Sequence, residues 1–89
     1  MIELGGNIFL ENFDDLDLGM LVVVKKIIGN YARQIAVSVE NYKKITVSIK
    51  EKSEYDVNVK VEANKLIEAR AKDKNLFFAL DRALAQILE

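Results

Sequence analysis

Alternation of apolar and polar residues dominates the middle of the chain, between residues 45 and 72. The apolar members fall into three runs: Ile45, Val47 and Ile49; Tyr55, Val57, Val59 and Val61; Ile67, Ala69 and Ala71. The residues between them are mostly polar or charged, which is typical of strands with one buried and one solvent-exposed face. Short polar turns at 51–54 and 64–65 separate the runs. This pattern predicts a three-stranded antiparallel meander.

Two other stretches have the three- and four-residue spacing of amphipathic helices. The first apolar stripe contains Met20, Leu21, Val24, Ile27, Ile28, Tyr31 and Ile35, and the second contains Leu76, Phe77, Leu80, Ala83, Leu84, Ile87 and Leu88. The β-branched run 22–24 locally favours a strand, but the stripe continues well beyond it, so we predict a helix. Possible N-cap residues precede both stripes: Asp14, Asp15 and Asp17 before the first, Asp73 or Asn75 before the second.

Two segments are less clear. Residues 2–12 are rich in strand formers but are interrupted by Gly5-Gly6-Asn7, which predicts either a bulge or a tight turn. We interpret residues 2–12 as one irregular strand. In residues 36–43, Val37 and Val39 either extend the first helix or begin a strand.

Together these elements predict an α+β fold with the order β-α-β-β-β-α. A single domain spanning residues 1–89 is expected from the length, with a four-stranded, mainly antiparallel sheet and two helices on one face. Its core should be formed by Met20, Val24, Ile27, Ile45, Val47, Ile49, Val57, Val59, Val61, Ile67, Ala69, Leu80, Leu84 and Ile87.

Gly29 lies inside the first predicted helix, where glycine costs about 1 kcal/mol relative to alanine. Close packing of the helix against the sheet is the explanation that we favour. The alternative is functional: a glycine would let the backbone of a binding partner approach the helix closely.

Composition argues against an enzyme and against metal or cofactor chemistry. The chain has no cysteine and no histidine, which removes thiolate chemistry, the usual general base and the commonest metal ligand. The aspartates of 14–17 lack the glycine and distal glutamate of a calcium loop, so we assign them to a helix N-terminus. No phosphate-binding loop follows Gly5-Gly6-Asn7. No apolar run is long enough to span a bilayer and no signal peptide is visible, so we expect a cytoplasmic protein.

The formal net charge is only −1, but the basic residues are unevenly distributed. Outward positions of the predicted meander carry Lys44, Lys50, Lys60, Arg70 and Lys72, and the polar side of the first helix carries Lys25, Lys26, Asn30 and Arg33. Such segregation predicts a basic surface for nucleic acid, although a solvated lysine-rich face has the same pattern. The aromatic pairs that stack bases on the sheet of an RNA-recognition motif are missing, and so is the Gly-x-x-Gly loop of a KH domain. Charge and shape would therefore have to carry RNA binding.

The last third of the chain has a more specific pattern. Ile67, Ala69 and Ala71 are followed by a polar turn, and then by Asn75, Phe77, Ala79, Leu80 and Asp81 at the start of the last helix. Residues 61–81 thereby resemble the ribosome hibernation promoting factor family, which has a strand I-x-A-x-A followed by D-x-Y-x-A-I-D. Asparagine stands here where that family usually has aspartate, and phenylalanine where it usually has tyrosine. The family's element order, a double-stranded-RNA-binding-domain-like arrangement, is the order predicted above.

This resemblance implies binding to the small ribosomal subunit through basic residues on the helices. The residues available for that role are Lys25, Lys26, Arg33, Lys74 and Arg82. With the meander residues, the predicted RNA-binding set is Lys25, Lys26, Arg33, Lys60, Arg70, Lys72, Lys74 and Arg82. The alternative hypothesis is a homodimeric interaction module without nucleic acid, with residues 36–43 at the interface because no role within the chain is evident for them.

Overall fold

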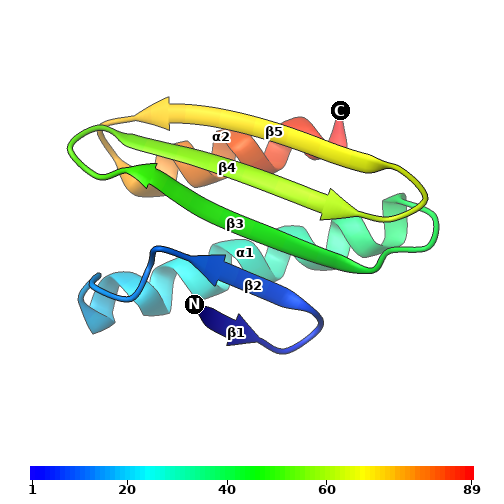
Figure 1. Cartoon of the computed structure of the whole chain (residues 1–89), viewed down its shortest axis with the longest axis horizontal. Coiled ribbons are helices and arrows are strands. Elements are labelled where there is room, and N and C mark those ends of the chain that lie inside the picture. Colours follow the sequence, from blue (N-terminus) through cyan, green and yellow to red (C-terminus); the bar gives the residue numbers. More distant parts are fainter.

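A computed structural model describes all residues 1–89 and contains seven elements. The five strands are β1 (Ile2–Leu4), β2 (Ile8–Glu11), β3 (Lys44–Glu51), β4 (Tyr55–Glu62) and β5 (Leu66–Asp73), and the two helices are α1 (Leu18–Ser38) and α2 (Leu76–Leu88). Both helices lie on the same face of the sheet, and the opposite face is left uncovered (Figure 1). The α+β class and the predicted placement of the helices are therefore correct.

The strands lie in the order β1-β2-β3-β4-β5 within one sheet. β2 and β3 run parallel, with Ile8 opposite Ile45, while every other neighbouring pair is antiparallel. The meander β3-β4-β5 is the one that the alternation predicts. Its register places Val47 opposite Val59, and Val59 opposite Ala69, so the apolar residues of the three strands share the face that the helices cover.

The first segment differs from the prediction, because residues 2–12 contain two strands in place of one irregular strand. Gly5-Gly6-Asn7 forms a tight turn between β1 and β2, with positive φ at Gly6 (74°) and Asn7 (61°). These conformations suit glycine and asparagine, and they reverse the chain where a bulge would only have bent it. The sheet consequently has five strands and not four.

The core lies between the sheet and the two helices. Most of the predicted core residues are fully buried there, while Met20, Ile27 and Ile67 are partly buried and pack against it. Phe13 is also completely buried, although it belongs to the loop between β2 and α1 and has no place in any periodic pattern. The predicted helix starts are close to those observed. The Asp17 side chain caps α1 by accepting a hydrogen bond from Met20 N (2.9 Å), and Asn75 caps α2.

Residues 36–43 have roles within the chain, contrary to the premise of the dimer hypothesis. α1 continues to Ser38, so Val37 lies on the helix, where it is exposed. Val39 packs against the core, and the Tyr42 hydroxyl donates to the carbonyl oxygens of Gly6 (2.9 Å) and Asn7 (3.3 Å). Tyr42 thereby ties the start of β3 to the turn between β1 and β2.

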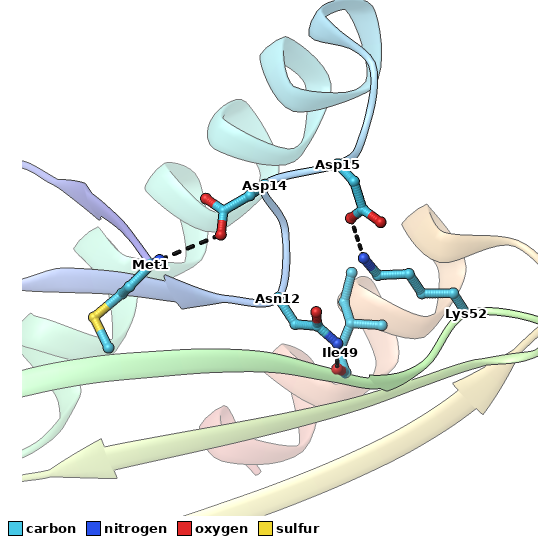
Figure 2. A network of polar contacts seen from close by, with 6 residues as sticks. All are labelled: Met1, Asn12, Asp14, Asp15, Ile49 and Lys52. Atoms are coloured by element: carbon cyan, nitrogen blue, oxygen red, sulfur yellow. Dashed lines mark hydrogen bonds and ion pairs between the residues drawn. The ribbon is translucent and has the colours of Figure 1, made fainter.

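The loop that leads into α1 is held by polar contacts with the N-terminus, with β3 and with the β3–β4 turn (Figure 2). The Asn12 side chain donates to the carbonyl of Ile49 (2.8 Å), where the β3–β4 register shifts. Asp14 accepts from the amino group of Met1 at 3.3 Å, and Asp15 forms an ion pair with Lys52 in the β3–β4 turn. These contacts fix the position from which α1 crosses the sheet.

The two edges of the sheet differ. β1 is three residues long, whereas β5 presents eight residues at the opposite edge. One carbonyl of this edge is covered by a side chain, since Gln86 Nε2 of α2 donates to Arg70 O (3.0 Å). Covering of this kind reduces the tendency of an edge strand to pair with another chain.

Candidate nucleic-acid interface

The outer side of α1 carries three of the predicted RNA-binding residues together. Lys25, Lys26 and Arg33 are exposed, and they line one shallow concavity of about 380 Å³ with Gly29 and Asn30. α1 contains no aspartate or glutamate, and none of the three cations forms an ion pair. Their positive charge is therefore uncompensated. We call Lys25, Lys26 and Arg33 the α1 cationic surface.

The predicted cations of the sheet occupy the opposite face of the molecule. Lys60, Arg70 and Lys72 lie on strands β4 and β5 and point away from the helices, because the residues that alternate with them are in the core. The single basic surface expected from Lys25, Lys26, Arg33, Lys60, Arg70 and Lys72 is therefore divided between two faces. A rigid, flat ligand cannot contact both groups at once.

Acidic residues neutralise much of the sheet face. Arg70 holds the nearly buried Asp56 through two hydrogen bonds, one of them from Nε at 2.8 Å, and Lys60 lies 3.8 Å from Glu68. The hydrogen bonds from Arg70, reinforced by nearby positive charges, lower the pKa of Asp56 below its ordinary value. Lys72 is placed opposite Asp56 by the strand register. The cations of the sheet face thus already lie beside carboxylates of neighbouring strands when no ligand is bound.

Of the last two predicted residues, one precedes α2 and the other lies in the middle of that helix. Lys74 is exposed in the connection between β5 and α2, and Arg82 forms an ion pair with Asp73 (3.3 Å). A neighbouring contact joins the two helices, since the Tyr31 hydroxyl donates to Asp81 Oδ1 at 2.6 Å. That hydrogen bond, together with partial burial, raises the pKa of Tyr31 above its ordinary value.

Gly29 is not explained by close packing, so our preferred interpretation of it was wrong. A Cβ atom added at Gly29 would meet nothing within 4 Å. The helix therefore carries a glycine in its interior without any neighbour that requires one. The alternative interpretation, close approach of a binding partner, is the one that this open space permits.

A second concavity adjoins the cationic one, and no sequence pattern predicted it. This groove, of about 370 Å³, lies between α1 and the β1–β2 turn, and its lining includes Gly5, Gly6, Gly29, Ala32, Arg33 and Tyr42. We call it the glycine groove. Residues far apart in the sequence build it, so only the presence of glycines in unexpected places could have hinted at it. It contains no acidic residue.

Other kinds of site find no support in the structure. No group of three or more acidic, histidine or cysteine side chains is arranged to hold a metal ion. Neither helix combines the length and apolar character needed to cross a bilayer. The three aspartates at 14, 15 and 17 are engaged separately, with Met1, with Lys52 and with the first turn of α1.

Comparison with known proteins gives a likeness in structure only. No protein-family model and no curated protein matches the sequence. The N-terminal domain of Thermus thermophilus Protein Y superimposes with a TM-score of 0.63, covering 97% of this chain and 91% of that domain at 14% identity. A ribosomal subunit interface protein from Coxiella burnetii also gives 0.63, covering 90% of this chain and 87% of its own at 13% identity. The resemblance seen in residues 61–81 is thus confirmed in structure, and the chain has the fold of these two proteins.

Proposed function

We propose that this chain is a single, non-catalytic, cytoplasmic domain that binds structured RNA of the ribosome through the α1 cationic surface. One observation carries the proposal: three uncompensated cations project from one helix of a fold shared with a ribosomal subunit interface protein. A cluster of basic side chains without acidic neighbours attracts phosphates, since counterions released from RNA on binding favour the complex.

The two groups of cations do not contribute equally in this proposal. Lys60, Arg70 and Arg82 already have carboxylate partners, so a phosphate would have to compete with Glu68, Asp56 and Asp73. A phosphate that binds the three cations of α1 has no carboxylate to displace. Lys72 and Lys74 are secondary candidates for phosphate contacts.

Salt dependence provides the first test. If the three α1 cations each neutralise one phosphate, the logarithm of the affinity should fall with the logarithm of salt concentration with a slope of about −2.1 to −2.7. Raising monovalent salt from about 50 to 200 mM should then weaken binding by roughly 20- to 40-fold. Co-sedimentation with small ribosomal subunits, or anisotropy of a labelled RNA hairpin, would measure this.

Charge-reversal variants test which face of the protein binds the RNA. The double variant Lys26→Glu, Arg33→Glu should abolish most of the salt-dependent binding without unfolding the protein, because both side chains are exposed. The matched control, Lys60→Glu with Lys72→Glu, changes the net charge equally on the opposite face and should have the smaller effect. A folded protein without salt-dependent binding refutes the proposal, and equal losses in the two double variants refute the choice of face.

The second candidate function is a homodimer formed by the edge of β5. Antiparallel pairing of two β5 strands centred on Ala69 would place Glu68 of each chain opposite Arg70 of the other, two complementary pairs. Gln86 would have to leave the carbonyl of Arg70. Sedimentation as a monomer at high micromolar concentration would eliminate this candidate.

A further inference from the structure

The two concavities beside α1 adjoin each other, because both are lined by Gly29 and Arg33. They differ in chemistry. The walls of the glycine groove are mainly glycine, alanine and other apolar surface, whereas the neighbouring concavity is lined by two lysines, an asparagine and the shared arginine. A mainly apolar concavity thus lies next to a cationic one.

A nucleotide has the same two parts. Its base is flat and offers an apolar face, while its phosphate is a compact anion that basic side chains bind. The groove volume of about 370 Å³ lies within the range of small-ligand sites. Arg33 stands between the two parts, where a planar guanidinium can stack on a base or hold a phosphate.

We propose that one unpaired nucleotide of the bound RNA occupies this pair of concavities, with its base in the glycine groove and its phosphate on Lys25, Lys26 and Arg33. The inference rests on the proposed function and adds a preference within it. A base within a regular duplex is stacked and cannot enter a groove, whereas a bulged or loop nucleotide can be splayed out.

Gly29 acquires a role in this arrangement. It lines both concavities, and a Cβ atom added to it would meet no other part of the protein within 4 Å. A side chain at this position would project into the passage between base and phosphate. A Cβ atom added at Gly5 or Gly6 would likewise meet nothing within 4 Å, so no side chain projects from these two residues on the opposite wall of the glycine groove.

The test uses two RNA hairpins that are identical except for one bulged nucleotide in the stem of the second. Fluorescence anisotropy at about 50 mM salt should show the wild-type chain binding the bulged hairpin about tenfold more tightly, the gain expected from one accommodated base. Gly29→Leu should reduce the ratio of the two affinities to less than about twofold. Gln34→Leu is the matched control, because Gln34 is an exposed residue of the same helix that lines neither concavity.

The possible outcomes separate this inference from the proposed function. Absence of salt-dependent binding to both hairpins would remove the proposed function and this inference together. Equal affinity of the wild-type chain for both hairpins would overturn the nucleotide site and leave RNA binding intact. The same conclusion follows if Gln34→Leu loses the preference as fully as Gly29→Leu. Titration of the protein with adenosine monophosphate completes the test. If this nucleotide saturates the protein at concentrations similar to those needed with the bulged hairpin, the site binds free nucleotides and the RNA assignment is overturned.

Discussion

Replacing Gly29 by alanine should make the protein more stable, as expected where a binding site keeps a residue that is not optimal for stability. Glycine in a helix interior costs roughly 0.5–1 kcal/mol relative to alanine, because the unfolded chain loses more freedom on folding. At Gly29 the added methyl group meets no atom within 4 Å, so no steric penalty offsets the gain. For a chain of 89 residues, that gain corresponds to an increase in melting temperature of about 2–8 °C.

Urea unfolding followed by circular dichroism measures this directly, with the midpoint expected to rise and the slope to stay constant. Gly19→Ala is the internal comparison, since a Cβ there would lie 3.3 Å from Oδ1 of Asp17, the residue that caps α1. That carboxylate would have to shift, so Gly19→Ala should gain less. A Gly29→Ala protein that is equally or less stable would mean that an unseen packing constraint explains the glycine, and the argument for a partner there would fail.

Three further predictions concern stability. Leu80→Ala should lower the free energy of unfolding by about 2–5 kcal/mol, because Leu80 is completely buried, and calorimetry would detect the fall. Asp17→Ala should cost about 1 kcal/mol through loss of the α1 cap, measured as a lower urea midpoint. Because Arg70 lowers the pKa of Asp56 below 3.8, this carboxylate should stabilise the fold above about pH 4 and progressively less as pH falls through the lowered pKa. Asp56→Asn should flatten that part of an acid-unfolding curve, and an unchanged curve would contradict the role of the pair.

The fold was largely predictable because its periodic segments are long. The alternation through Val47, Val59 and Ala69 survives in the observed register, and both helix stripes face the sheet. The first hairpin was missed because strands of three and four residues are too short to show alternation around Gly5-Gly6-Asn7. Phe13 was not predicted to belong to the core, because a residue that is buried in a loop is part of no periodic pattern.

The candidate site was only partly predictable. Sequence spacing placed Lys25, Lys26 and Arg33 on one side of a helix, and that grouping is observed. Pairing across strands depends on register, so the neutralisation of Arg70 by Asp56 could not be foreseen from their separate positions in the chain. The glycine groove depends on how the β1–β2 turn is placed beside α1 in three dimensions, which no local pattern encodes.

The parallel pairing of β2 with β3 affects how this chain folds. β3, β4, β5 and α2 follow one another both in sequence and in space, so they can assemble through short loop closures (Figure 1). The contact between β2 and β3 forms only after the 21 residues of α1 and its connections have been brought back across the sheet. The seam between β2 and β3 should therefore close late in folding and open first in the native state, and amide hydrogens of β2 should exchange faster than those of β4. Because β1 and β2 lie on the far side of that seam, the β1–β2 turn, which forms one wall of the glycine groove, would be the last part of the molecule to become ordered.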